Sequence, residues 1–250
     1  MDYTSLNKEI TKLAEYSKHL SSKHYVLEAI IGHAYNFCFT EIAQYGARPF
    51  PYIPKLTKIS YYEAKDEKEE ELLVKCLVLL CKLYKNSEPF EDVLTNLYGP
   101  MLGTKLGQCM TPPDLSSVLF HLTDSNNELE KHLEKNNTFS IYDPTSGTGS
   151  LLLGSLREIY SKYGKETLEK IDLFACDLDM KMCIATAVNL ELSSLSHRIN
   201  YNQLTIYNEN SLLGPNRENI FLEILPNRLL HKKAFSLEDT EIKEAAWINF

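Results

Sequence analysis

The sequence has no excess of positive charge. Its composition also excludes a fibrous or disordered chain. Its 250 residues carry 26 Lys and Arg against 34 Asp and Glu, which gives a formal net charge of −8. A protein that binds the phosphates of a nucleic acid by itself is normally basic. Any contact of this chain with a nucleic acid must therefore be limited to a small region of its surface or be made through another chain. Hydrophobic residues make up 44% of the chain, enough for a sizeable core.

Long hydrophobic runs are also missing. The longest unbroken one extends from Cys76 to Cys81, far shorter than a membrane-spanning helix. The first ten residues, MDYTSLNKEI, contain neither a charged leader nor a hydrophobic signal region. We therefore expect a cytoplasmic protein with no membrane segment.

The six cysteines lack the spacing of a metal or disulfide framework. Cys76 and Cys81 lie five positions apart, Cys176 and Cys183 lie seven apart, and no Cys-x-x-Cys pair occurs. The seven histidines are scattered and do not have the spacing of metal ligands. We expect buried free thiols in a reducing compartment and no metal site.

Glycine is scarce in the first 98 residues, where only two of the ten glycines occur. Apolar residues there recur every three or four positions across 6–38 and 72–83, the period of amphipathic helices. We therefore predict a helical domain over residues 1–98 and a second domain over residues 99–250.

Two segments of the helical part carry signals of their own. Three prolines between residues 47 and 56 each remove a backbone donor, which predicts an irregular connection. The charge-dense run 63–71 precedes the third apolar stretch, and carboxylates are favourable at the amino end of a helix. We interpret this run as a solvated helix start rather than a binding site.

The second part alternates between two hydrophobic periods. Residues 139–143, 171–177 and 203–208 have the pattern of strands, and residues 151–160 and 181–192 have the pattern of helices. Strands that alternate with helices predict an α/β fold with a parallel sheet. The residues after Gly214 leave room for about one more helix and one more strand.

The most informative segment is Asp143-Pro-Thr-Ser-Gly147-Thr-Gly149-Ser, which follows the first predicted strand and opens a helix. Glycines there allow a sharp turn, and the amides at a helix start favour an anion. Asp177 closes the next strand, where an acid in a Rossmann-like sheet can accept hydrogen bonds from both ribose hydroxyls. Together these features indicate a nucleoside-bearing cofactor.

Each acid also has an ordinary interpretation. Asp143 could be a turn or capping aspartate, and Asp177 could simply start the following helix. A dinucleotide fingerprint would need a third glycine three positions after Gly149, and here Gly154 follows it by five. This displacement disfavours a nicotinamide-dependent enzyme.

From about Phe90 to Leu213 the sequence resembles the adenine-N6 DNA methyltransferases of type I restriction-modification systems, in particular the modification subunit. Residues 105–112 (KLGQCMTP) are similar to the family motif Lys-x-x-Gly-Gln-aromatic-aromatic-Thr-Pro, although a cysteine and a methionine replace both aromatics. In the family this segment covers the methionine end of S-adenosylmethionine. The resemblance therefore implies cofactor contacts from Gln108, Thr111 and Pro112.

Three further motifs follow in order. The segment that begins at Asp143 resembles the family's Asp-Pro-Ala-Cys-Gly-Ser-Gly-Gly, and Phe174-Ala-Cys-Asp177 resembles the pattern whose acid holds the ribose. The segment 207–213 resembles a Gly-Asp-x-Leu motif whose acid accepts from the adenine amino group, and an uncharged amide stands there, which predicts weaker affinity. The cofactor-binding residues implied by the resemblance to these motifs are Asp143, Thr145, Gly147, Gly149, Asp177, Leu178 and Asn210.

The catalytic motif of the family, Asn/Asp-Pro-Pro-aromatic, does not occur in the 250 residues. The only consecutive prolines, Pro112 and Pro113, belong to the segment that covers the cofactor. Residues 245–250 (AAWINF) resemble the strand that approaches the motif, but the two prolines are absent. We predict no catalytic residue; Asn249 could be a remnant of the motif or an ordinary solvated side chain.

The resemblance implies a Rossmann-like S-adenosylmethionine-dependent methyltransferase fold and, for an active protein, methyl transfer to adenine in DNA. Two alternatives stay open: an inactive relative with a regulatory or anti-restriction role through protein partners, or a fragment that needs a second chain for catalysis. The sheet is expected to be truncated, so that a normally central strand lies at or near an edge. We therefore expect a protein partner or self-association, with DNA bound through a partner subunit.

Overall fold

The computed structural model describes residues 3–41, 62–99, 111, 113–214, 216–225 and 247–249. The proline-rich connection predicted over 47–56 and the thiol of Cys109 lie outside these residues. The elements that precede the sheet are α1 (Tyr3–Tyr16), α2 (Lys23–Asn36), the π-helix η1 (Phe37–Glu41), α4 (Glu67–Lys85), α5 (Val93–Tyr98), α6 (Pro113–Thr123) and α7 (Glu128–Leu133).

The helices α1, α2 and α4 confirm the apolar period of the first part of the chain. Leu6, Ile10 and Leu13 form the buried face of α1. Helix α2 is buried on most sides because it packs against α1 and α4 and also against α10 (Met180–His197). The amino-terminal helices and the second part of the chain therefore share one hydrophobic core, and the domain boundary at residue 98 stays a prediction.

The charge-dense run forms the start of α4, as predicted. One of its side chains, Glu69, is buried rather than solvated. The carboxylate of Asp66 accepts from the backbone N–H of Glu69 (2.9 Å), and the Glu69 carboxylate accepts from the backbone N–H of Lys65 (2.6 Å). This reciprocal pairing satisfies two backbone donors at the helix start. Glu69 is therefore buried, whereas its neighbours in the run are mostly exposed.

The second part of the chain forms a five-stranded sheet in the order β4-β3-β2-β1-β5, and this α/β architecture confirms the predicted fold class. Strands β1, β2, β3 and β5 are parallel, and β4 runs antiparallel to β3. The three strands predicted from the sequence have the bounds expected of them. The strands are β1 (Phe139–Asp143), β2 (Ile171–Asp177), β3 (Gln203–Asn208), β4 (Ile220–Ile224) and β5 (Trp247–Asn249).

The prediction of one strand after Gly214 was wrong, because the described residues beyond it contain two. The segment Ile220–Ile224, apolar apart from Glu223, follows the short 3-10 helix η4 (Arg217–Asn219) directly and returns beside β3 as its antiparallel neighbour. Such a hairpin-like return needs no crossover helix, in contrast to the parallel connections earlier in the chain.

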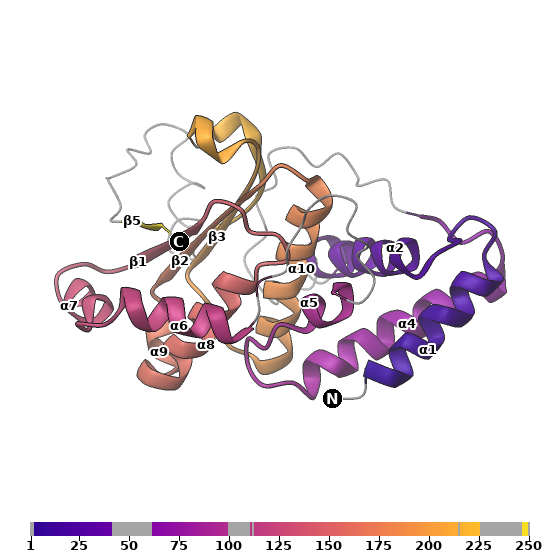
Figure 1. Cartoon of the computed structure of the whole chain (residues 1–250), viewed down its shortest axis with the longest axis horizontal. Coiled ribbons are helices and arrows are strands. Elements are labelled where there is room, and N and C mark those ends of the chain that lie inside the picture. Colours follow the sequence, from indigo (N-terminus) through magenta and orange to yellow (C-terminus); the bar gives the residue numbers. More distant parts are fainter. Residues whose placement is uncertain are drawn as a thin grey trace.

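The crossover helices α8 (Ser150–Tyr163) and α10, together with the short helix α9 (Lys165–Leu168), connect the parallel strands. Right-handed crossovers that proceed from β1 to β2 to β3 place α8 and α10 on the same face of the sheet. In Figure 1 the sheet lies to the left, α1, α2 and α4 gather to the right, and α10 stands between them. Ile141, Leu173 and Leu204 are among the strand residues that contribute to the common core.

A second and smaller cluster is separate from that core. It contains Cys176, Tyr207 and Ile220, with Tyr142 and Phe174 packed against them. On β1, β2 and β3 these side chains alternate with the residues that face α8 and α10, so they belong to the other face of the sheet. Ile220 joins them because it is paired with Tyr207, beyond a shift in the register of β3 and β4. Among the described strands, β5 pairs with β1 at one end of the sheet, so β1 lies one strand from that end. The truncation of the sheet stays a prediction.

Gly154 allows two helices to approach closely. A Cβ atom added at Gly154 of α8 would lie 2.1 Å from the hydroxyl oxygen of Ser116 and 2.4 Å from its Cβ, so α6 leaves no space for a side chain. The glycine that is displaced from the dinucleotide pattern therefore serves contact between helices. This explains why it need not keep the spacing of a phosphate-binding turn.

The described cysteines are free thiols. Cys38, Cys76, Cys176 and Cys183 are buried and Cys81 is half-buried, as expected for structural cysteines. Among the described residues, no group of three or more His, Cys, Asp and Glu side chains could hold a metal ion. Within the same part of the chain, no helix has the length and hydropathy needed to cross a membrane.

We predict that Gly154→Ala lowers the free energy of unfolding by about 2–3 kcal/mol, because the new methyl group forces α6 away from α8. Denaturant unfolding measures this change. The double variant Gly154→Ala/Ser116→Gly removes the opposing side chain and should recover part of the loss. Equal stability of the parent and Gly154→Ala would show that the two helices are not in close contact.

Candidate functional site

The structure brings the two predicted acids to the same edge of the sheet. Asp143 ends β1 and Asp177 ends the neighbouring parallel strand β2. The turn that follows β1 lies against the end of β2. The backbone N–H of Ser146 donates to the carbonyl oxygen of Cys176 (2.9 Å), and the N–H of Gly147 donates to the carboxylate of Asp177 (2.9 Å). The acids and the glycine turn between them therefore form one site.

The glycine turn needs both of its glycines. The N–H of Gly149 donates to the carbonyl oxygen of Ser146 (2.7 Å), and Gly147 and Gly149 have φ values of +54° and +87°. L-residues with a side chain rarely adopt such values. Gly149 is also the N-cap of α8 and has no side chain to accept from the first helical amides. These uncapped N–H groups favour an anion.

Asp143 is a buried acid with one unsatisfied oxygen. It is only 1% exposed, and its Oδ1 accepts from the backbone N–H of Thr145 (3.1 Å), while Oδ2 has no hydrogen-bond partner among the described residues. Burial raises the pKa of Asp143 to about 6, the hydrogen bond from Thr145 opposes this rise, and the negative charge of Asp177 adds to it. A buried oxygen of this kind fits a ligand that brings an N–H donor or a positive charge.

Asp177 is half-buried and already accepts two hydrogen bonds. Besides the bond from Gly147, its Oδ1 accepts from the backbone N–H of Asp179 (2.9 Å). A carboxylate offers about four acceptor positions, so it can still accept from ligand hydroxyls. The next side chain, Leu178, is 73% exposed and could cover a planar apolar group at this edge.

The third predicted motif lies beside Asp177. Asn208 of β3 is paired with Asp177, and its side-chain amide donates to the carbonyl oxygens of Asp177 and Leu178 (both 3.0 Å). Asn210 caps the 3-10 helix η3 (Ser211–Leu213), because its Oδ1 accepts from the N–H of Leu212 (3.1 Å). The oxygen expected to contact adenine therefore already has one partner, and its role towards a ligand stays a prediction.

The remaining predicted positions divide between described and undescribed residues. Gln108 and Pro112 lie outside the residues that the structure describes, and Thr111 is described as half-buried. The segment expected to approach the catalytic motif does form a strand, β5. The backbone of Asn249 lies opposite Tyr142 in the register, one residue before Asp143 in β1.

Sequence reasoning missed the polar side chains of α10 that face the glycine turn. The residues from Met182 to Ser194 are all buried, and Thr186, Asn189 and Ser193 form a polar stripe on this otherwise largely apolar helix. The Thr186 hydroxyl donates to the carbonyl oxygen of Gly147 (2.8 Å), and Asn189 donates to that of Thr148 (2.9 Å). Polar residues at spacings of three and four on a buried helix were the available signal.

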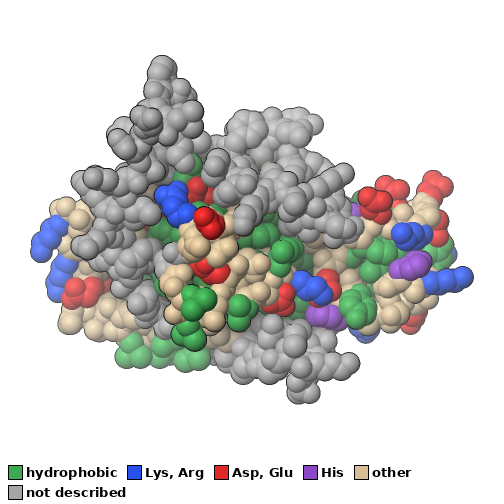
Figure 2. Space-filling view, turned by 90° about the horizontal axis from the view of Figure 1, so that it is seen from above, with side chains coloured by type: hydrophobic (Ala, Val, Ile, Leu, Met, Phe, Trp, Pro, Cys, Tyr) green, Lys and Arg blue, Asp and Glu red, His purple; other side chains and the backbone are tan. Residues whose placement is uncertain are grey.

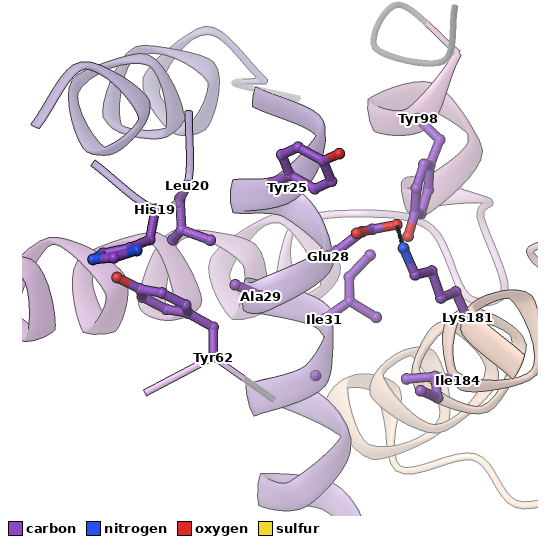
Figure 3. A pocket seen from close by; sticks show the side chains of 11 residues that line it. His19, Leu20, Tyr25, Glu28, Ala29, Ile31, Tyr62, Tyr98, Lys181 and Ile184 are labelled. Atoms are coloured by element: carbon purple, nitrogen blue, oxygen red, sulfur yellow. Dashed lines mark hydrogen bonds and ion pairs between the residues drawn. The ribbon is translucent and has the colours of Figure 1, made fainter. Parts of the chain in front are cut away.

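A separate pocket of about 300 Å³ lies along α2. His19 and Tyr62 line one side of it, and Tyr98 and Lys181 line the other, where Lys181 forms an ion pair with Glu28 (2.7 Å), as Figure 3 shows. None of the predicted cofactor residues that the structure describes lines this pocket. It lies at the junction between the amino-terminal helices and the first turn of α10.

Comparison with protein families supplies an independent finding. Residues 87–246, more than half of the chain, match the family described as N-6 DNA Methylase. Among curated proteins, none matches the chain.

Solved structures with a similar arrangement are distant in sequence. A class I S-adenosylmethionine-dependent methyltransferase from Listeria monocytogenes is 11% identical, with a TM-score of 0.44 over 98% of this chain and 93% of that chain. A type I restriction-modification methyltransferase subunit from Streptococcus thermophilus is 19% identical, with a TM-score of 0.38 over 60% of this chain and 30% of that chain. A type I modification subunit from Vibrio vulnificus is 17% identical, with a TM-score of 0.33 over 64% and 27%. The chain thus spans less than a third of either subunit.

We predict that Asp143→Asn raises the free energy of unfolding at pH 8 by about 1–2 kcal/mol, because it removes an unpaired buried charge. The folded protein binds this proton more tightly than the unfolded chain, so the parent loses stability as pH rises from the ordinary pKa of 3.8 through about 6. The advantage of the variant should therefore shrink as pH falls from 6 towards 4. Thermal unfolding at several pH values measures it.

Asp124→Asn is the matched control, since this buried carboxylate has partners. Burial favours a raised pKa for Asp124, but hydrogen bonds from Lys162, Leu129 and Tyr163 together lower it. The control should therefore lose stability at pH 8. A loss of stability in Asp143→Asn as well would show that the second oxygen of Asp143 has a partner in the folded protein.

Proposed function

Because the chain belongs to the N-6 DNA Methylase family, we propose that it binds S-adenosylmethionine at the carboxyl ends of β1 and β2, as the cofactor-binding part of an adenine-N6 DNA methyltransferase. The observation that supports this most strongly is the buried, unpartnered oxygen of Asp143 beside the uncapped start of α8. The methionine end of this cofactor carries both an ammonium group and a carboxylate. It therefore matches an acid next to free amides.

Each residue at the sheet edge is proposed to contact a different part of the cofactor. The Asp143 carboxylate would accept from the ammonium group, and the first amides of α8 would donate to the cofactor's carboxylate. Asp177 would accept from the ribose hydroxyls. Leu178 would pack on the adenine ring, and Asn210 would accept from the adenine amino group with its second lone pair. We also propose that Gln108, Thr111 and Pro112 contact the methionine end, as the resemblance to the family implies.

When bound, the cofactor supplies a methyl group on a positively charged sulfur. The residues of this chain bind and orient it. A Cβ atom built at Gly147 would have no described atom within 4 Å, so a ligand has room to approach the backbone there. The two acids contribute negative charge at the same edge, which favours a cationic cofactor.

Methyl transfer to adenine needs further groups. The exocyclic amine of a flipped base must be held by acceptors and the base stacked on an aromatic ring. The 250 residues contain no Asn/Asp-Pro-Pro-aromatic motif to do this, although β5 brings the backbone of Asn249 to the edge where Asp143 lies. We therefore propose that these groups come from outside these residues. An inactive relative that acts through protein partners is the second candidate, and the missing motif favours it.

DNA contact is proposed to involve a partner chain. The net charge of −8 opposes tight binding to phosphates. On the face seen in Figure 2, acidic, basic and hydrophobic side chains are interspersed over the coloured surface, without a broad field of Lys and Arg. A partner with a basic surface would supply the charge that the described part of this face lacks.

Calorimetric titration with S-adenosylmethionine tests the proposal. Asp177→Ala should weaken binding at least tenfold, which corresponds to about 1.4 kcal/mol, because the ribose hydroxyls and the N–H of Gly147 lose their acceptor. Asp179→Ala is the matched control, with the same loss of charge two residues away. It should bind within about threefold of the parent, since the backbone N–H of residue 179 is kept.

Heat from the parent and the control, but not from Asp177→Ala, supports the proposal. No heat from the parent would remove cofactor binding from it. A methyl-transfer assay on adenine-rich DNA separates the two candidate functions. Incorporation by this chain alone would contradict the statement that the catalytic groups come from elsewhere.

A further inference from the structure

A buried hydrogen-bond network connects the amino-terminal helices to the glycine turn. The hydroxyl of Tyr84, on α4, donates to the side-chain oxygen of Asn189 on α10 (2.6 Å). The Asn189 amide nitrogen in turn donates to the carbonyl oxygen of Thr148 (2.9 Å) and to the carboxylate of Asp92 (2.8 Å). Tyr84, Asp92, Thr148 and Asn189 are all at least 95% buried. One side chain therefore joins α4, the start of α5 and the turn.

Asp92 is a buried acid whose two oxygens both have partners. Besides the bond from Asn189, its Oδ1 accepts from the backbone N–H of Thr95 (3.0 Å), as the N-cap of α5. Its Oδ2 accepts from the hydroxyl of Ser150, the first residue of α8. Hydrogen-bond donors thus hold the charge in place without a ligand, in contrast to Asp143.

Hydroxyl groups hold the turn on both sides of Gly149. The Thr95 hydroxyl lies 2.5 Å from the hydroxyl of Thr148 and 2.8 Å from that of Ser150. Thr148 is therefore held at its carbonyl by Asn189 and at its side chain by Thr95. The positive-φ residue between these anchors has little freedom left, although glycine is by itself the most flexible residue.

The chemistry of this network requires an amide at position 189. Tyr84 offers a donor, whereas Asp92 and Thr148 each offer an acceptor at this point. Only a side chain with one acceptor atom and a two-proton donor atom satisfies all three. An aspartate would direct a carboxylate oxygen at two acceptors. A leucine would leave the Tyr84 hydroxyl and the Thr148 carbonyl oxygen without this partner and would remove one of the hydrogen bonds to Asp92.

We infer that Tyr84, Asp92 and Asn189 are positioning residues that hold the glycine turn in its ligand-ready shape, so that the amino-terminal helices help to set cofactor affinity. This inference rests on the proposed binding of S-adenosylmethionine. Its physical basis is preorganisation: a turn that is ordered before the ligand arrives does not lose that conformational entropy on binding. A network that only attached the helices to the sheet would affect stability but not affinity.

Tyr84→Phe tests the inference because it removes one hydroxyl and keeps the ring. The matched control is Tyr35→Phe, the same change at another buried tyrosine, whose ring packs against Phe39 and Phe221. We expect Tyr84→Phe to weaken S-adenosylmethionine binding at least fivefold and to speed amide hydrogen exchange in the peptide 146–150 at least fivefold. The control should stay within twofold of the parent in both measurements.

A pair of exchanged side chains separates positioning from attachment. Asn189→Asp alone should lower both thermal stability and affinity. Adding Asp92→Asn restores a donor and an acceptor between positions 92 and 189, but it returns no donor to the carbonyl oxygen of Thr148. The double variant should therefore regain thermal stability over Asn189→Asp while its affinity stays at least fivefold below that of the parent.

The outcomes distinguish this inference from the proposed function. If the parent binds the cofactor and Tyr84→Phe binds equally well with unchanged exchange, the inference is overturned and the proposed function stands. If the parent does not bind, the proposed function fails, and hydrogen exchange in 146–150 alone decides whether the network orders the turn. Recovery of full affinity in the double variant would also overturn the inference, since attachment would then suffice.

Discussion

The structure depends on a sharp change of chain direction between β1 and α8. This turn has two positive φ angles, and its backbone N–H groups and carbonyls need partners in a mostly buried place. The neighbouring strand and α10 supply them. Asp177 accepts from Gly147, and Thr186 and Asn189 donate to the two successive carbonyl oxygens of Gly147 and Thr148. The site exists because β2 and α10 converge on one short loop.

Two buried carboxylates near this loop differ in how many of their oxygens have hydrogen-bond partners. Asp92 has hydrogen-bond partners on both oxygens and acts as a permanent part of the framework. Within the described part of the chain, Asp143 keeps one oxygen without a partner, and burial raises its pKa to about 6. A folded protein tolerates an unsatisfied buried acid at the expense of stability, and such groups are enriched at functional sites. The contrast explains why the ligand is proposed at Asp143, although both acids lie close to the same turn.

Much of the fold could be predicted from local sequence patterns. The strands that contain Asp143, Asp177 and Asn208 were predicted with their observed bounds, because alternating apolar residues and a following glycine or acid mark where a strand ends. Strand β4 was missed, since a five-residue apolar run does not reveal its direction or neighbour. Asn189 was noted only as part of a helix, because its partners lie 41, 97 and 105 residues away along the chain.

The sequence by itself determined the order of elements from β1 to β3, the position of the glycine turn and the identity of the two acids that end β1 and β2, because these follow from short-range periodicity and backbone chemistry. Only the tertiary structure decided that both oxygens of Asp92 have partners, that Gly154 allows α6 and α8 to pack closely, and that Tyr84 connects to the turn. Hydrogen-bond satisfaction and steric contact depend on atoms brought together from distant parts of the chain. No local pattern specifies them.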